Sequence, residues 1–197
     1  MKILSNNLNN RDIKLNFANL FMYKTRLYAF IKKISPILWY TRPMTKFMIH
    51  LFKNKKLIGL EIGVEYGLNA KTMLTLLPIE KLYMVDPYIN NDQMYRETRK
   101  YLAKYDDKTI FIRKTSENAA NEIPDKLDFV YLDGAHTYEA VKKDIELIYN
   151  KIKKGGILGG HDFWANEIGV CKAVLEFVEY NNLTINGKLT DWWIVKE

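Results

Sequence analysis

The sequence predicts a doubly wound α/β fold: a seven-stranded, mostly parallel sheet with an antiparallel last strand, preceded by a helical segment. From residue 57 onward, short apolar runs typical of buried parallel strands alternate with amphipathic helical stretches. Polar residues follow five of these runs, at strand ends that meet at one edge of such a sheet. We therefore predict a Rossmann-like domain over residues 57–197 and a basic, aromatic-rich helical cap segment over residues 1–56.

The stretch LIGLEIGVEYGLNA, residues 57–70, forms the centre of the predicted domain. Its apolar run indicates a strand covered on both faces. Gly63 and Gly67 mark a turn in which the backbone passes close to another group, and Asn69 suits the N-cap of the next helix. A strand, a glycine turn and a helix N-terminus together indicate a nucleotide or nucleoside site.

The residues of this turn narrow the choice of ligand. The dinucleotide pattern G-x-G-x-x-G is absent, because Glu65 and Leu68 occupy its second and third glycine positions. The carboxylate of Glu61 beside the turn would repel a pyrophosphate but suits an ammonium or sulfonium group. S-adenosylmethionine (SAM) carries both groups. The alternative is an ordinary strand-to-helix turn without a ligand, since short glycine patterns recur by chance.

The later elements alternate in the same way up to a final hairpin. We predict helices over residues 70–77, 92–105, 118–122, 138–153 and 168–180. We predict strands over residues 81–85, 109–112, 127–132, 157–160, 183–185 and 192–195. Pro78 ends the first of these helices, Thr137 caps the fourth, and Gly155-Gly156 closes it. Asn186-Gly187 indicates the turn of the hairpin.

Two strand ends supply candidate groups for binding a nucleoside. Asp86 follows the second strand, 19 residues after Gly67, where Rossmann-like folds hold ribose hydroxyls through a carboxylate. The alternative for Asp86 is a solvated turn before Pro87. Ser116 and Glu117 follow the third strand, and either could hydrogen-bond the amino group of an adenine. Ser116 is equally suited to an N-cap.

The residues that directly follow the fourth and fifth strands are the candidate catalytic and metal-binding residues. Asp133 and His136 follow the fourth strand, and His161-Asp162 follows the fifth. Ligands of open parallel sheets bind outside the carboxyl ends of the strands. We therefore expect one crevice to bring together Gly63, Asp86, Ser116, Asp133, His136, His161 and Asp162.

The N-terminal segment holds most of the positive charge. Residues 1–56 contain 12 Lys or Arg and one acid, Asp12, a net charge of +11, which leaves 7 − 11 = −4 for the rest. Apolar residues at helical spacing predict a helix over residues 17–34, and a second helix is predicted over residues 44–52. The first helix is a cap on the domain or in a homodimer, or a basic helix in peripheral contact with a membrane. Interleaved aliphatic residues argue against nucleic-acid binding.

Composition restricts the cellular setting. The single cysteine, Cys171, excludes an internal disulfide framework and favours a reducing compartment. No apolar run reaches the roughly 18 residues of a membrane span. The first residues lack the apolar region of a signal peptide. We therefore expect a cytoplasmic protein, which is peripheral to the membrane if the N-terminal helix binds lipid.

Four segments carry a resemblance to a known family: EIGVEYG, VDPY, DGAHTYEAVKKDIE and KKGGILGGHDF. Over residues 57–197 the chain resembles class I SAM-dependent methyltransferases. It is similar to the small O-methyltransferase-like group that includes macrocin O-methyltransferase and cephalosporin-hydroxylase-type proteins. The resemblance implies SAM as cofactor. The cofactor-binding residues it implies are Glu61, Gly63, Gly67, Asp86, Ser116, Glu117 and Asp133.

Two mechanisms of methyl transfer to a hydroxyl follow from this resemblance. In the first, His136 is the general base, oriented by Asp133 or Asp162. In the second, a divalent metal such as Mg²⁺ or Mn²⁺ activates the hydroxyl. Metal-dependent relatives place an acid after the fourth strand and an acidic pair after the fifth. Asp133 and Asp162 match that pattern, whereas His161 replaces one acid and shifts the preference from Mg²⁺ toward Mn²⁺, Fe²⁺ or Zn²⁺.

The same residues bear on three alternatives to methylation of a small hydroxylated molecule. A nucleic-acid methyltransferase would show an N-P-P-Y element or a cysteine nucleophile, and LDGAH is neither. The combination of Glu61, Gly63, Gly67 and Asp86 argues against a non-catalytic scaffold. Aminopropyl transfer or hydroxylase-like chemistry stays open. Aromatic residues expected near the crevice suit a sugar or an aromatic ring, so we expect a saccharide or small hydroxylated acceptor. These aromatic residues are Tyr88, Tyr138, Phe163, Trp164, Trp192 and Trp193. For Trp192 and Trp193, which straddle the two faces of the last strand, the first interpretation is packing.

Overall fold

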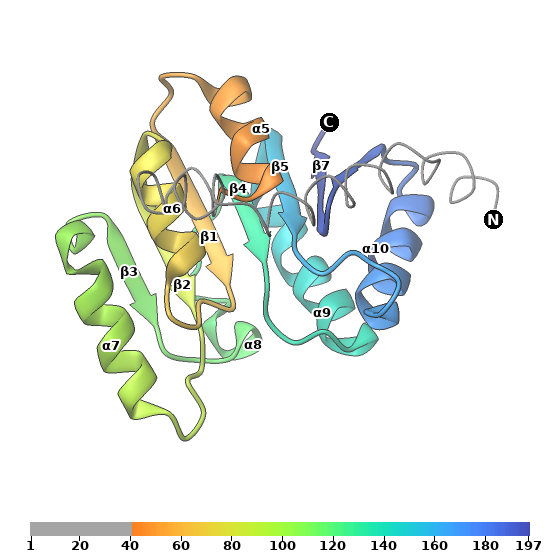
Figure 1. The fold of residues 1–197 in the computed structure, drawn as a ribbon. Coiled ribbons are helices and arrows are strands. Elements are labelled where there is room, and N and C mark those ends of the chain that lie inside the picture. Colours follow the sequence, from red (N-terminus) through yellow and green to blue (C-terminus); the bar gives the residue numbers. More distant parts are fainter. Residues whose placement is uncertain (1–40) are drawn as a thin grey trace, which may run out of the picture. The chain divides into compact units, whose positions relative to one another are not determined.

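In residues 41–197, which the computed structural model describes, seven strands form one sheet in the order β3-β2-β1-β4-β5-β7-β6 (Figure 1). The strands are Leu57–Ile62 (β1), Ile79–Val85 (β2), Thr109–Ile112 (β3), Leu127–Leu132 (β4), Ile152–Gly160 (β5), Ile185–Lys188 (β6) and Asp191–Val195 (β7). β1 to β5 are parallel, and β7 runs antiparallel to both β5 and β6. The predicted doubly wound sheet with an antiparallel last strand is confirmed.

The helices cover both faces of this sheet. They are Pro43–Phe52 (α5), Leu68–Leu76 (α6), Asp92–Leu102 (α7), Ser116–Ala119 (α8), Tyr138–Ile148 (α9) and Ile168–Tyr180 (α10). One apolar core joins the sheet to α8, α9 and α10, and another joins its opposite face to α5 and α6. Trp192 belongs to the first core and its neighbour Trp193 to the second, as alternation along a strand requires.

The compact unit begins at Arg42, so it includes α5, which the sequence analysis had grouped with the N-terminal segment. The helix predicted over residues 17–34 lies outside the described residues, and so do the homodimer and membrane contacts expected of it. None of the helices in residues 41–197 has the length and apolar character needed to cross a membrane.

Several predicted boundaries are wrong; α8 spans Ser116–Ala119 and not residues 118–122, and the other large errors lie around β5 and β6. α9 ends at Ile148 and β5 begins at Ile152, so Gly155 and Gly156 lie within a strand and do not close a helix. The cause is an irregular β4–β5 register, in which Ile152 already pairs with Leu127. β6 spans Ile185–Lys188, so the hairpin turns two residues after Asn186-Gly187, where Leu189 has φ +57°.

Two capping predictions are also wrong. Gly67, with φ +74°, is the N-cap of α6, and Asn69 lies inside the helix, where its side chain bonds Glu61 instead. Thr115, not Ser116, caps α8, because its hydroxyl accepts the backbone N–H of Asn118. The predicted Thr137 cap of α9 is confirmed, since its hydroxyl accepts the N–H of Ala140.

Candidate active site

A cavity of about 810 Å³ opens at the carboxyl ends of the central strands. Its volume lies in the range of small-molecule sites in proteins. Nine of the predicted site residues line it: Glu61, Gly63, Asp86, Ser116, Glu117, Asp133, His136, His161 and Asp162. Gly67 is not among the lining residues. The predicted convergence on one crevice is confirmed, while the roles of the individual residues stay predictions.

Glu61 places a buried acid against the cavity, because β1 carries it into the sheet with a relative exposure of 1%. The Asn69 side-chain amide donates a hydrogen bond of 2.8 Å to Glu61 Oε1. Glu61 Oε2 and Asn69 Oδ1 have no hydrogen-bond partner among the described residues. Burial raises the pKa of Glu61 from its ordinary 4.5 to about 8, against the opposing effect of Asn69.

The two predicted glycines have different roles in the turn. Gly63 has φ +84°, and a Cβ there would lie 2.1 Å from the Asp133 carbonyl oxygen. The tips of β1 and β4 can therefore meet only at a glycine. At Gly67 a Cβ would instead meet Leu102, so this glycine serves the packing of α6 on α7 and has no direct contact with the cavity.

Asp86 lines the cavity, but its carboxylate also holds the turn after β1. Oδ2 accepts the backbone N–H groups of Val64 and Glu65 at 2.9 and 3.0 Å. Oδ1 accepts the backbone N–H of Tyr88 at 2.8 Å. The residue therefore fixes the loop through three hydrogen bonds, which the expectation of a ribose-binding acid did not include.

The predicted adenine-facing residues have partners on α9. The Ser116 side chain hydrogen-bonds Asp144, a buried acid whose pKa is raised by burial. Glu117 forms an ion pair with Lys143. Asp144 and Lys143 both line the cavity and were not singled out from the sequence. Their helical spacing on α9 gave only an amphipathic pattern, which indicates packing and not a site.

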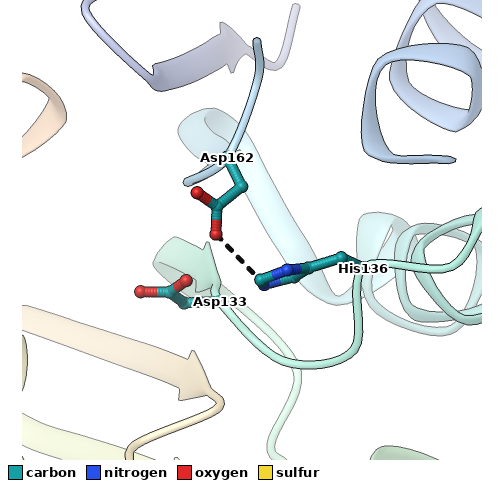
Figure 2. Close-up of side chains that lie close together, drawn as sticks. All are labelled: Asp133, His136 and Asp162. Carbon is teal, nitrogen blue, oxygen red and sulfur yellow. Dashed lines mark ion pairs between the residues drawn. The ribbon is translucent and has the colours of Figure 1, made fainter. Parts of the chain in front are cut away.

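Figure 2 shows the catalytic candidates Asp133, His136 and Asp162 close together. His136 Nε2 lies 3.1 Å from Asp162 Oδ2, and its Nδ1 lies 3.7 Å from Glu167 Oε2. Asp162 has φ +58°, a left-handed conformation that turns its side chain at the end of β5. Burial raises the pKa of Asp133, and the nearby His161 and Arg42 oppose that increase. Asp162 is therefore the nearer partner of His136.

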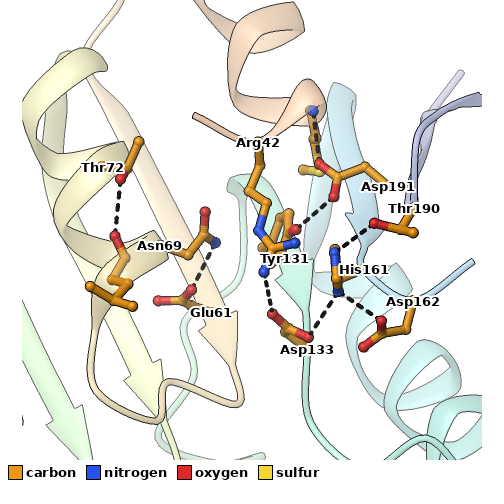
Figure 3. A network of polar contacts seen from close by, with 12 residues as sticks. Arg42, Glu61, Asn69, Thr72, Tyr131, Asp133, His161, Asp162, Thr190 and Asp191 are labelled. Carbon is orange, nitrogen blue, oxygen red and sulfur yellow. Dashed lines mark hydrogen bonds and ion pairs between the residues drawn. The ribbon is translucent and has the colours of Figure 1, made fainter. Parts of the chain in front are cut away.

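His161 lies between Asp162, Asp133 and Thr190 (Figure 3). Its Nδ1 lies 3.0 Å from Asp162 Oδ1 and 3.7 Å from Asp133 Oδ1. Its Nε2 lies 2.7 Å from the Thr190 hydroxyl, so both ring nitrogens face protein groups. One ligand atom each from Asp133, His136 and Asp162 lie within 4.8 Å of one another, so a candidate metal set contains His136 where the sequence analysis had chosen His161.

Arg42 is a lining residue that the sequence analysis did not identify. It precedes α5 and lies 3.6 Å from Asp133 Oδ2 through its Nη2 atom. Its sequence neighbours carry no nucleotide or catalytic motif. The sequence around Arg42 contains one structural signal, the proline that starts a helix. This signal predicts the helix boundary and does not indicate a binding site.

The six aromatic residues expected near the crevice do not form its lining. Tyr88, Trp192 and Trp193 are 4%, 1% and 7% exposed and belong to the packed interior. None of the six lines the cavity. Among them Trp164 is the most exposed, at 43%. The large apolar side chains that do line the cavity opening are Leu68 and Ile89, which are more than half exposed.

Known structures share the fold at low sequence identity. A candidate caffeoyl-CoA O-methyltransferase from Staphylococcus aureus is 16% identical, with a TM-score of 0.63 over 92% of this chain and 98% of its own. SMU.1697c, a candidate methyltransferase from Streptococcus mutans in complex with SAH, is 18% identical, with a TM-score of 0.62 over 80% and 99%. CalS11, the TDP-rhamnose 3'-O-methyltransferase of calicheamicin biosynthesis, is 15% identical, with a TM-score of 0.63 over 98% and 90%.

No curated protein matches the chain significantly in sequence. The sequence profile of the family described as Methyltransferase domain matches residues 60–163 of 197, which is more than half of the chain. The matched range runs from β1 to the residue after Asp162, so it contains nearly all of the cavity. The chain therefore belongs to this methyltransferase domain family and is a class I SAM-dependent methyltransferase.

Proposed function

We propose that the protein transfers the methyl group of SAM to a hydroxyl of a saccharide or small metabolite, with His136 as general base. The observation that carries this proposal is the 3.1 Å contact between His136 and Asp162 in the same cavity as the buried acid Glu61. A base and a site for a cationic cofactor then share one space, as methyl transfer requires.

The residues of the cavity fit SAM. Glu61 Oε2 and Asn69 Oδ1 are buried acceptors without a partner among residues 41–197, and an α-ammonium group would supply the missing donors. The two exposed apolar side chains at the opening, Leu68 and Ile89, suit the face of an adenine. When bound, SAM supplies an electrophilic methyl group on a sulfonium.

The two carboxylates near the imidazole of His136 define its part in the reaction. If Nε2 carries the proton and donates it to Asp162, Nδ1 is the nitrogen that accepts the proton of the hydroxyl. Glu167 lies 3.7 Å from Nδ1 and stabilises the imidazolium that forms. This is the arrangement of a base held between two carboxylates, of which Asp162 fixes the ring and Glu167 balances the new charge.

A metal-assisted reaction is the second candidate, and one observation favours it. Asp133, His136 and Asp162 each offer a ligand atom, all within 4.8 Å of one another. Two carboxylates and one imidazole suit Mn²⁺ or Zn²⁺ better than Mg²⁺. A metal on Nε2 of His136 would replace its 3.1 Å contact with Asp162, so His136 cannot be base and ligand in the way described above.

The first experiment is calorimetric titration of the metal-stripped protein with SAM, alone and with Mg²⁺ or Mn²⁺, followed by methyl-transfer assays on a panel of saccharides and hydroxylated metabolites. We expect His136→Gln to lower the turnover rate by about 10²- to 10⁴-fold with little change in SAM affinity. His50→Gln, in an exposed position on α5, is the matched control. Absence of SAM binding under every condition would overturn the proposal. Activity that appears only with metal would favour the second mechanism.

A further inference from the structure

The guanidinium of Arg42 faces the cavity and donates no hydrogen bond to any of the described residues. Two Arg or Lys residues line the cavity, Arg42 and Lys143, and Lys143 is paired with Glu117. The guanidinium of Arg42 lies 3.6 Å from Asp133 Oδ2, a distance beyond hydrogen bonding, and its side chain is 32% exposed. Its donors are therefore available to a bound group.

The first turn of α5, which directly follows Arg42, is held in place by a residue 147 positions after Met44 in the chain. Asp191, at the start of β7, is 1% exposed and accepts the backbone N–H of Met44 at 3.0 Å through Oδ2. Its Oδ1 accepts the Tyr131 hydroxyl of β4 at 3.0 Å. Asp191 thus supplies a cap for the first turn of α5 and ties it to β4, the strand that ends at Asp133 (Figure 3).

Arg42 and Glu61 present opposite charges to the same cavity. Arg42 opposes the burial-induced rise in the pKa of Glu61, so the two groups interact electrostatically. A ligand with an ammonium beside a carboxylate would match both, because the free Oε2 of Glu61 accepts and the guanidinium donates. A planar guanidinium binds a carboxylate through two parallel hydrogen bonds.

We propose that Arg42 binds the α-carboxylate of the methionyl part of SAM and that Asp191 positions it for this role. The inference rests on the proposed use of the cavity for SAM and assigns a residue N-terminal to the matched family range to cofactor recognition. The competing role is a counter-ion for Asp133. A counter-ion would affect ligands with and without a carboxylate equally.

The test compares SAM with decarboxylated SAM, which lacks only the α-carboxylate, by calorimetric titration of the full-length protein. We expect Arg42→Gln to weaken SAM binding on the order of 10- to 100-fold and to change the affinity for decarboxylated SAM less than about twofold. Arg42→Lys should lie between wild type and Arg42→Gln, because it keeps the charge and loses the fork. Lys46→Gln, exposed on α5 one turn after Arg42, is the control.

A second variant tests the positioning role of Asp191. Asp191→Asn should reduce the preference for SAM over decarboxylated SAM while Arg42 is still present, and a melting curve verifies that the variant is folded. Equal weakening of both ligands by Arg42→Gln, or no weakening of either, would overturn the assignment and leave the methyltransferase proposal intact. If the wild-type protein binds neither ligand, the proposed function itself fails.

Discussion

Asn69 donates a 2.8 Å hydrogen bond to Oε1 of Glu61, while Oε2 of the same carboxyl group has no partner among the described residues. With a pKa raised to about 8 by burial, this carboxyl is mostly protonated at neutral pH. A cationic group at Oε2 would favour the ionised form. Binding of a cation and loss of a proton from Glu61 are therefore coupled.

The first prediction is that SAM binding releases a proton. The affinity should increase from pH 6 toward pH 8, because the ionised form of Glu61 is the one that pairs with the ammonium. It should decrease again above about pH 8, where an α-amino group itself loses its proton. Calorimetry at pH 6.5 in two buffers of different ionisation enthalpy measures the released proton. A Glu61→Gln variant should release none, and equal enthalpies in both buffers for the wild type would contradict the prediction.

The second prediction concerns the stability of the ligand-free protein. The pKa of Glu61 is about 8 in the folded protein, whereas the unfolded chain has the ordinary value of 4.5. Between pH 4.5 and 8 the folded chain therefore binds more protons than the unfolded chain. The contribution of Glu61 is therefore most favourable below about pH 4.5 and is lost as pH rises through 8. Glu61→Gln should flatten this decrease, which amounts to roughly a few kcal/mol. Urea denaturation at pH 5.5, 7 and 8.5 measures it, and parallel curves for the two proteins would contradict the assignment.

The elements that the sequence predicted well are those whose pattern is local. β3 and β4 have the predicted bounds because each is a short apolar run between polar residues. The end of α9 was missed because Ile152 continues the helical apolar spacing, although its actual partner is Leu127 on β4. Only the sheet register, a long-range property, decides between the two.

The site residues that the sequence predicted are likewise those marked by a local pattern, and the missed ones depend on long-range contacts. Residues directly after strands were found, since topology alone brings strand ends to one edge. Arg42 was missed because Asp191, which caps its helix, is 147 positions from Met44 in sequence. Trp192 and Trp193 enter the two cores, so the interpretation of these residues as packing is confirmed, because alternation along a strand is a local property.

The third prediction is that Gly63 tolerates no side chain. A Cβ at Gly63 would lie 2.1 Å from a backbone oxygen of Asp133, and φ is +84°. Relief requires separation of the tips of β1 and β4, so Gly63→Ala should destabilise the protein by about 3 kcal/mol or more. Gly134→Ala is the control on the facing loop, because its Cβ would have no neighbour nearer than 3.6 Å. Similar urea midpoints for both variants would refute the close-approach argument.

The fourth prediction treats Asp86 as a support of the turn. Asp86→Ala leaves the backbone N–H groups of Val64, Glu65 and Tyr88 without their acceptor, so it should lower stability by about 2–3 kcal/mol as well as SAM affinity. Asp86→Asn keeps one acceptor oxygen and should lose less of both. A role in ribose binding alone would lower affinity without a change in the denaturation midpoint, so measurement of both quantities separates the two roles.

The fifth prediction uses Asp128, which lies at the beginning of β4, the end of the strand away from the cavity. The carboxylate is 1% exposed, accepts the backbone N–H of Ile58 at 2.9 Å and pairs with Lys55 and Lys153 at 2.8 and 3.1 Å. Burial opposes its ionisation, but these three partners outweigh burial and hold the pKa of Asp128 below its usual range. Its stabilising contribution is therefore present above the ordinary pKa of an aspartate and is lost as pH falls through the lowered value.

Asp128→Asn should consequently reduce stability by about 1–3 kcal/mol at pH 7 and by less at pH 3, the opposite trend to that of Glu61. Denaturation at both pH values measures the difference. The affinity for SAM at pH 7 should equal that of the wild type, because the substitution lies at the other edge of the sheet from Glu61 and Asp86. A loss of affinity with an unchanged denaturation midpoint would show that the cavity is sensitive to the far end of β4, which the contacts of Asp128 do not predict.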